Sequence, residues 1–401
     1  MRARVGRDGR RALLLNLLLV AVSATLLLGV LEVAARLVRE DPGEPIAAQY
    51  TEFDPIPGWR HRPHAIARFP QGDYAINSRG LRDHERSLDP PASTFRVMLL
   101  GDSFAEGFGV PFEDSVAQVL ERRLHHAGCA VEVIGAGTVG YSTDQEYLFY
   151  RDQGARYGPR LVVLLFYYND ILYNARGSIG RAAKPLLSFA DGAVRVQNAP
   201  LAAPSNEAQW WRGDRAKKPR LRSLDWLRQR LLTGAPRGHD ALAHLGFWPM
   251  RDAARSGDEL SVFNRNLPPL VLEAWVQTIN ILRALRDEAA RHAARLLIVY
   301  VPSKMEVNAR DWVLTRESYA VDEQAWDKRQ VARWLAEACR DLGISCVDPS
   351  EALETEERGP RGPTYEALGS HWNAVGHGVA ALAIEGALRR NGSLPACAPG
   401  S

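Results

Sequence analysis

Five short apolar runs, separated by segments with helical spacing, constrain the fold of this chain more than any other feature. The runs occupy residues 95–100, 131–134, 161–168, 295–301 and 344–348. Helical spacing is found at residues 114–126, 142–154, 270–292, 322–342 and 373–391. The third run is apolar on both faces, which is typical of a central strand in a parallel sheet. This alternation predicts an α/β protein, a three-layer α/β/α sandwich with a five-stranded parallel sheet.

An uncharged apolar stretch at residues 12–31 precedes the predicted sheet. As a helix it is about 30 Å long, which matches the hydrocarbon core of a bilayer. Five arginines come before it: Arg2, Arg4, Arg7, Arg10 and Arg11. The positive-inside rule then places the N-terminus in the cytoplasm and the rest outside. A cleaved signal peptide is the alternative, but its apolar region is normally about 7–15 residues long. We predict an uncleaved transmembrane signal anchor, and a periplasmic folded part on a single-pass protein of the cell membrane.

The chain divides into three predicted parts. Residues 1–40 form the basic tail and the anchor, and residues 41–92 form an irregular lead-in rich in Pro, Gly, Arg and Asp. Residues 93–395 form the α/β domain, with an insertion at about 175–265. Within the insertion, residues 184–198 predict a hairpin around Asp191-Gly192. The charged run 212–222 is interpreted as a solvated face, and Trp210 and Trp211 as packing the insertion onto the core.

Composition narrows the classes of function. A net charge of +3 over 401 residues argues against a nucleic-acid partner. The four cysteines do not make a disulfide scaffold, and free thiols and disulfides are both compatible with their positions. No Cys/His grouping has metal-ligand spacing, and no glycine-rich phosphate-binding pattern follows a strand. We therefore expect neither a metal nor a nucleotide cofactor.

Residues suited to acyl transfer follow the ends of the predicted strands. Ser103 comes after the first strand, Gly140 after the second and Asn169 after the third, and His371 precedes the last helix. Each alone is compatible with a plain turn or a helix cap. Ligands of parallel sheets bind at the carboxyl ends of the strands, where all four are expected to meet. Together they supply a nucleophile, oxyanion donors and a base.

These blocks resemble the SGNH/GDSL hydrolase superfamily, and stretches at residues 57–59, 76–82 and 301–306 are similar to those of its membrane-anchored bacterial esterases. The resemblance implies a flavodoxin-like fold and no cofactor. It implies that Ser103 is the nucleophile and His371 the base. It further implies an oxyanion hole made by the backbone N–H groups of Ser103 and Gly140 and the side-chain amide of Asn169.

One position departs from the family pattern. The family usually has an aspartate two or three residues before the histidine, where this chain has Gly369 and Leu368. Glu366 is a possible orienting acid, five residues before His371, and Asp348 is a less favoured substitute. A Ser-His dyad held by a backbone carbonyl and an inactive site are also compatible with the sequence.

Three further polar residues lie beside these blocks. Asp102 and Asp170 are interpreted as structural, because each can accept hydrogen bonds from its own turn. Lys304, just after the fourth strand, either binds an anionic substrate or is simply exposed.

Three functions are compatible with these features. The favoured one is an extracytoplasmic, membrane-tethered serine esterase that cleaves acyl esters of a small molecule, lipid or glycan through a Ser-His acyl-enzyme mechanism. The second is an O-acyltransferase acting on an exported polysaccharide, and the third is a non-catalytic glycan-binding protein that retains the fold. The joint occurrence of the four blocks favours an enzyme.

Overall fold

A computed structural model describes most of the chain: residues 7–38, 46–69, 72–180, 182–204, 259–319, 321–366, 369–394 and 397, with isolated positions between 221 and 247. It separates into two compact units. One comprises Met1–Gly43 and Asp214–Pro249, and the other comprises Glu44–Gly213 and Met250–Ser401.

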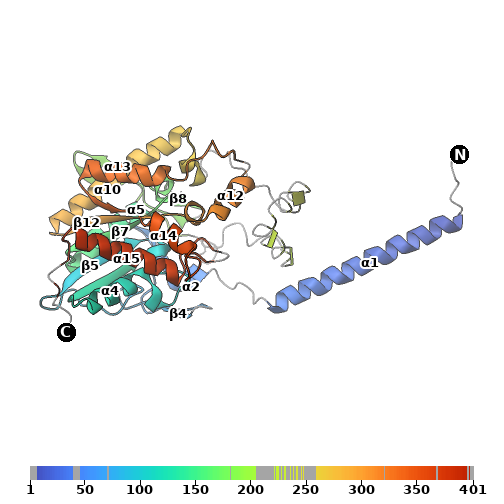
Figure 1. Ribbon diagram of the computed structural model, residues 1–401, viewed down its shortest axis with the longest axis horizontal. Helices are drawn as coiled ribbons and strands as arrows, with labels where there is room; N and C mark the ends of the chain where they lie inside the picture. Colours follow the sequence, from blue (N-terminus) through green and yellow to red (C-terminus); the bar gives the residue numbers. More distant parts are fainter. Residues whose placement is uncertain are drawn as a thin grey trace. The chain divides into compact units, whose positions relative to one another are not determined.

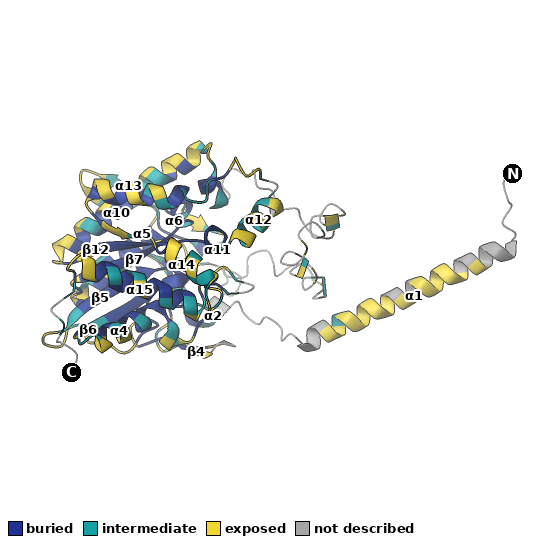
Figure 2. Ribbon diagram, in the orientation of Figure 1, coloured by how far each residue is buried: buried dark blue, intermediate teal, exposed yellow. Residues whose placement is uncertain are grey.

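Helix α1 (Arg7–Val38) belongs to the first unit and contains the predicted span 12–31. Its segment Leu15–Ala34 has a mean hydropathy of 2.4, and none of that segment is buried in the structure (Figure 2). It is the one helix among the described residues that is long and apolar enough to cross a bilayer.

The second unit is built on a parallel five-stranded sheet with the order β13-β12-β7-β5-β6 (Figure 1). Its strands are β5 (Phe95–Gly101), β6 (Val131–Gly137), β7 (Leu161–Tyr167), β12 (Arg295–Val301) and β13 (Ser345–Val347). All five predicted runs are therefore confirmed as strands. Every residue of β7 is buried, as expected for the central strand.

Helices cover both faces of the sheet. The longer ones are α4 (Val116–His126), α5 (Thr143–Asp152), α10 (Pro269–Arg291), α13 (Gln330–Leu342), α14 (Ser350–Glu357) and α15 (Ala374–Arg390). On one face α5 packs on α10, and Trp275 of α10 lies 5.6 Å from Trp334 of α13, between ring centroids. On the other face α15 packs on α4 and α14 (Figure 1). The predicted three-layer sandwich is confirmed.

The strand order positions the site. The chain passes from β5 outward to β6 and then returns across β5 to β7, so the order reverses beside β5. In parallel sheets, ligands bind at the carboxyl ends of strands at such a reversal. At this edge Gly101 pairs with Gly137, and the short helix α3 (Ser103–Glu106) lies against the end of β6. A Cβ on Gly137 would lie 2.0 Å from the Glu106 backbone nitrogen, so only glycine permits this approach.

The lead-in is more regular than predicted. It contains α2 (Ile46–Tyr50) and two hairpins, β1 (Thr51–Asp54) with β2 (Gly58–His61) and β3 (Ile66–Phe69) with β4 (Gly72–Ala75). The prediction of an irregular segment over 41–92 is wrong for these elements, whereas residues 76–92 form neither helix nor strand. The strands have only four residues each, which is too short for a clear apolar alternation to identify them.

One helical prediction needs correction, and two helices of eight or more residues were missed. The helix expected over 322–342 begins at Gln330, because Trp326 is buried in the core and its Nε1 donates to Asn264 Oδ1 at 2.6 Å. This contact ties the preceding stretch to the 3₁₀ helix η4 (Glu259–Phe263), and tertiary packing overrides local helix propensity there. Helices α12 (Ala309–Ser318) and α14 were not predicted.

The described part of the insertion contains the predicted hairpin. Strand β10 (Leu187–Ala190) pairs with β11 (Ala193–Val196), and both turn residues, Asp191 and Gly192, have positive φ. A smaller pair, β8 (Ser178–Ile179) with β9 (Ala182–Ala183), precedes it. Trp210, Trp211 and, apart from Leu221, the charged run 212–222 lie outside the described residues.

All four cysteines are paired. Cys129 bonds to Cys397, 268 residues away, and Cys339 bonds to Cys346. The sequence was compatible with free thiols and with disulfides, and disulfides are present. The first bond ties the C-terminal segment to the loop that precedes β6.

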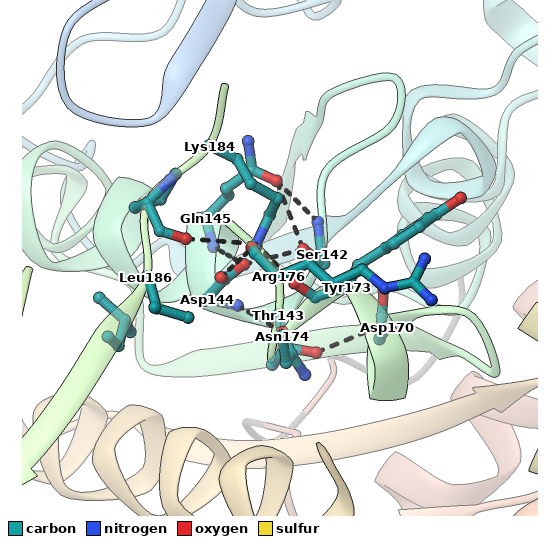
Figure 3. A network of polar contacts seen from close by, with 12 residues as sticks. Ser142, Thr143, Asp144, Gln145, Asp170, Tyr173, Asn174, Arg176, Lys184 and Leu186 are labelled. Carbon is teal, nitrogen blue, oxygen red and sulfur yellow. Dashed lines mark hydrogen bonds and ion pairs between the residues drawn. The ribbon is translucent and has the colours of Figure 1, made fainter. Parts of the chain in front are cut away.

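A buried ion pair anchors the insertion to the domain (Figure 3). The fully buried Lys184 Nζ pairs with the Asp144 carboxylate and donates to the Tyr173 backbone oxygen at 2.8 Å. Asp144 also accepts from Ser142 Oγ at 2.8 Å. Burial lowers the pKa of Lys184, and the negative charge of Asp144 raises it. Each charge leaves water on folding and depends on the other for compensation.

The Lys184→Met variant tests this anchor. Removing the cation leaves Asp144 buried without its counter-charge, and we expect the free energy of unfolding to fall by about 3–5 kcal/mol. Denaturant unfolding of the purified full chain measures it. The matched control is Lys328→Met, which breaks a 3.3 Å contact with Glu354 between partly exposed side chains, and such a pair contributes about 0–1 kcal/mol. Equal losses in the two variants would contradict the proposed role of Lys184.

Candidate active site

The serine and the histidine predicted from sequence meet at the carboxyl edge of the sheet. Ser103 is the first residue of α3, directly after β5, and its Oγ lies 2.8 Å from His371 Nε2. Asp102 caps this helix by accepting the Phe104 backbone N–H at 2.8 Å. A hydroxyl that can donate to an imidazole nitrogen in this way can be deprotonated as it attacks an electrophile.

The loop that carries His371 is held from three sides. Tyr365 and Trp372 form an isolated antiparallel bridge, in which the Glu366 N–H donates to the His371 carbonyl at 2.9 Å. Asn373 caps α15 by accepting from the backbone N–H groups of Val375 and Gly376. Lys304 Nζ donates to the Glu366 carbonyl at 2.9 Å, so this lysine supports the histidine loop.

Aromatic rings surround the imidazole. The centroids of Phe104 and Phe108 each lie 5.1 Å from that of His371, and Trp372 lies 5.0 Å from Phe104. Burial among these groups lowers the pKa of His371 to about 4, and the negative charge of Glu106 opposes this shift. The ring is therefore kept neutral and able to accept a proton at ordinary pH.

Two segments that carry predicted oxyanion donors lie at the carboxyl ends of β5 and β7. Thr138 donates to the Gly101 carbonyl at 3.0 Å, which brings the turn containing Gly140 to the end of β5. Asn169 follows β7, and its Oδ1 is buried without a partner. Within the described residues, the structure records no hydrogen bond from the backbone N–H of Ser103 or Gly140 or from Asn169 Nδ2. The role of these three groups as oxyanion donors stays a prediction.

The neighbouring acids have structural roles, as predicted. Asp170 Oδ2 accepts from the Tyr167 N–H and from Thr143 Oγ1, each at 3.2 Å. Burial raises the pKa of Asp102 to about 7. Burial also raises the pKa of Asp170 well above its ordinary value, and the charge of Asp102 adds to that shift. Asp348 Oδ1 accepts the Ser350 N–H at 2.9 Å, just before α14. Among the described residues no group of three metal-ligating side chains occurs.

Glu366 lies near the histidine without contacting its ring. A Cβ on Gly109 or on Gly369 would each lie 2.0 Å from a Glu366 carboxylate oxygen, so this carboxylate occupies the space between the two glycines. Burial raises its pKa and the charge of Lys304 lowers it. No hydrogen bond joins the Glu366 carboxylate to His371 among the described residues. Its role as orienting acid stays a prediction.

Sequence reasoning missed the residues that hold these loops. Glu106 accepts the Val139 N–H at 2.6 Å, and Trp59 Nε1 donates to the Val139 carbonyl at 2.9 Å. The partners are 33 and 80 residues apart, which no local pattern reveals. The resemblance of residues 57–59 to family members was the one available signal.

His377, interpreted from the sequence as structural, is fully buried, and burial lowers its pKa to about 3. Neither of its ring nitrogens has a partner among the described residues. It lies inside α15, with its ring 5.6 Å from that of Trp372.

Comparisons with known proteins identify the family to which this chain belongs. Residues 99–379, well over half of the chain, match the model of the GDSL-like Lipase/Acylhydrolase family. No curated protein gives a match. Similar solved structures include the lipase/acylhydrolase from Enterococcus faecalis (13% identity, 77% of this chain and 99% of that one, TM-score 0.38). A second is the esterase EstA from Pseudoalteromonas sp., with 8% identity over 74% of this chain and 98% of that one and a TM-score of 0.37. A third is the acetyl xylan esterase AlAXEase, with 13% identity over 73% of this chain and 100% of that one and a TM-score of 0.38. Because the match to the family model spans more than half of the chain and includes both Ser103 and His371, the chain belongs to the GDSL-like lipase/acylhydrolase family.

Proposed function

We propose that this protein is a membrane-tethered serine esterase that cleaves acyl esters carried by a small molecule, a lipid or a glycan. The observation that carries the proposal is the 2.8 Å contact between Ser103 Oγ and His371 Nε2. Family membership supports an ester substrate. The N–H groups of Ser103 and Gly140 and the Asn169 amide, for which no hydrogen bond is recorded among the described residues, support acyl transfer in particular, because that reaction needs an oxyanion site.

The mechanism has two halves. In the first, His371 Nε2 accepts the Ser103 proton as Oγ attacks the ester carbonyl, and the carbonyl oxygen becomes an oxyanion facing the N–H groups of Ser103 and Gly140 and the Asn169 amide. The imidazolium then protonates the departing alcohol, which leaves an acyl-serine. In the second, His371 deprotonates water, which attacks the acyl group. The imidazolium then returns this proton to Ser103 Oγ as the bond between Oγ and the acyl carbon breaks, which releases the carboxylic acid and restores the Ser103 hydroxyl.

The histidine works here as part of a dyad. Burial disfavours the imidazolium, and no carboxylate contacts the ring among the described residues to compensate. We infer that the packing of Phe104 and Phe108 orients the ring in place of an acid. The cost of this arrangement is a weak base, and we expect turnover below that of enzymes with a complete triad.

Three features support an extracytoplasmic location. Helix α1 suits a single bilayer crossing, and five arginines precede its apolar segment, a bias typical of the cytoplasmic side. The two disulfides bear on the same question, because such bonds persist in oxidising compartments such as the periplasm. We infer that the α/β domain faces that compartment.

The first test is p-nitrophenyl acetate hydrolysis by the purified chain. We expect Ser103→Ala to abolish turnover, and Asn169→Ala to lower kcat by about 10²–10³-fold, because one oxyanion donor is lost. The matched controls are Ser345→Ala and Asn391→Ala, at exposed positions outside the site. Hydrolysis by Ser103→Ala at the parent rate would refute the proposal.

The second test is the pH dependence of kcat/KM. Because protonated His371 cannot accept the serine proton, activity is lost as pH falls through its pKa, and the acid limb should have its midpoint at about 4. A midpoint near 6.5, the ordinary value for histidine, would contradict the burial of the ring.

The same profile measured on Glu366→Gln tests the orienting-acid prediction. A dyad predicts that the acid limb stays near 4 and that kcat changes by less than about tenfold, whereas removing a true triad acid costs about 10⁴-fold. A loss of that larger size would assign the orienting role to Glu366.

A further inference from the structure

The lead-in reaches both loops that surround the nucleophile. Tyr74 OH donates to the Gly107 carbonyl and accepts the Gly109 N–H, each at 2.8 Å. Arg82 donates to the carbonyls of Glu106 and Gly107 at 3.0 and 2.6 Å. These contacts fix the chain that follows Ser103, although the lead-in precedes the sheet in sequence.

Trp59, in strand β2, contacts the other loop. Its side chain is 1% exposed, and its Nε1 donates to the Val139 carbonyl at 2.9 Å. The hydroxyl of Tyr141, which lies two residues after Val139, donates to the Trp59 backbone carbonyl at 2.5 Å. The rings of Trp59 and Tyr141 meet edge to face, with centroids 5.7 Å apart. Trp59 is therefore bonded to the 138–141 turn at two points, through its indole N–H and through its backbone carbonyl.

In the turn at residues 138–141, the central peptide joins Val139 to Gly140, and a peptide in this place can adopt two orientations. Tyr141 donates to the Thr138 carbonyl at 3.1 Å, and Gly140 has φ +73°, which are the features of a type II turn. Types I and II differ mainly in the direction of the peptide between the two central residues, here Val139 and Gly140. That one peptide carries the carbonyl bonded by Trp59 and the N–H of Gly140.

A trans peptide is planar, so its C=O and N–H point in opposite directions. Fixing the Val139 carbonyl on the indole therefore fixes the direction of the Gly140 N–H. Glu106 holds the preceding peptide, since its carboxylate accepts the Val139 N–H at 2.6 Å. That carboxylate is itself held by Tyr50 OH at 2.7 Å and His61 Nε2 at 3.2 Å, both from the lead-in.

We propose that Trp59 is a positioning residue, which acts through the Val139–Gly140 peptide to aim the Gly140 N–H at the substrate oxyanion. The inference rests on the proposed function, because it takes Gly140 as an oxyanion donor. The inference gives the lead-in a part in catalysis. Without the indole N–H, the Val139–Gly140 peptide is free to rotate, and the oxyanion hole loses one preorganised donor.

The test compares phenyl acetate with its thionoester analogue, in which sulfur replaces the carbonyl oxygen. Sulfur is a weak hydrogen-bond acceptor, so the thionoester gains little from the oxyanion hole. The variant is Trp59→Phe, which keeps an aromatic ring and removes the donor. The matched control is Trp275→Phe, on the α10 face of the sheet. The measured quantity is the ratio of kcat/KM for the ester to that for the thionoester, which does not depend on the folded fraction.

We expect Trp59→Phe to lower this ratio by about tenfold or more, mainly through kcat on the ester, because a misplaced donor of this kind costs up to about 10²-fold. Trp275→Phe should leave the ratio at the parent value. If Trp59→Phe does not fold, Glu106→Gln replaces it, since one amide oxygen cannot accept from all three donors that now meet the carboxylate. An unchanged ratio in the folded variant would overturn the inference alone. A parent chain that hydrolyses neither ester would instead overturn the proposed function.

Discussion

The hydrogen bond between Ser103 Oγ and His371 Nε2 is 2.8 Å long and joins residues that are 268 positions apart, and the proposed acyl transfer depends on it. Each end is fixed by a different device. Ser103 stands on a capped turn at the end of a central strand, where Gly137 allows α3 to lie close to the sheet. His371 stands on a loop closed by the Tyr365–Trp372 bridge. The fold of the domain thus places the Ser103 hydroxyl and the His371 imidazole within hydrogen-bonding distance.

In the proposed dyad, His371 is a base placed without a carboxylate partner. Two phenyl rings and burial restrict the imidazole, and burial also lowers its pKa. Orientation and basicity, which one aspartate supplies together in a complete triad, are separated here. Packing provides the first and disfavours the second, so stabilisation of the oxyanion has to contribute more of the rate. This increases the importance of how firmly the donors are held.

The sequence predicted those parts of the fold that are encoded locally. Buried strands such as β7 follow from short-range patterns. The blocks around Ser103, Gly140, Asn169 and His371 could be located by their place after strands or before a helix. The four-residue strands of the lead-in could not be predicted, because they are too short to show a period. The hydrogen bond between Trp59 and Val139 could not be predicted either, because it forms only when these distant segments fold together. The Glu366 carboxylate has no recorded hydrogen bond to His371 among the described residues, although the Glu366 N–H donates to the His371 carbonyl, and this too required the three-dimensional structure.

The most direct measurement of the central claim is a crystal structure of the protein after reaction with a phosphonate ester, whose tetrahedral adduct imitates the acyl-transfer intermediate. The account predicts phosphorus bonded to Ser103 Oγ. It further predicts a phosphonyl oxygen about 2.7–3.1 Å from the N–H groups of Ser103 and Gly140 and from Asn169 Nδ2. Attachment at another residue, or an oxygen directed away from all three donors, would contradict it.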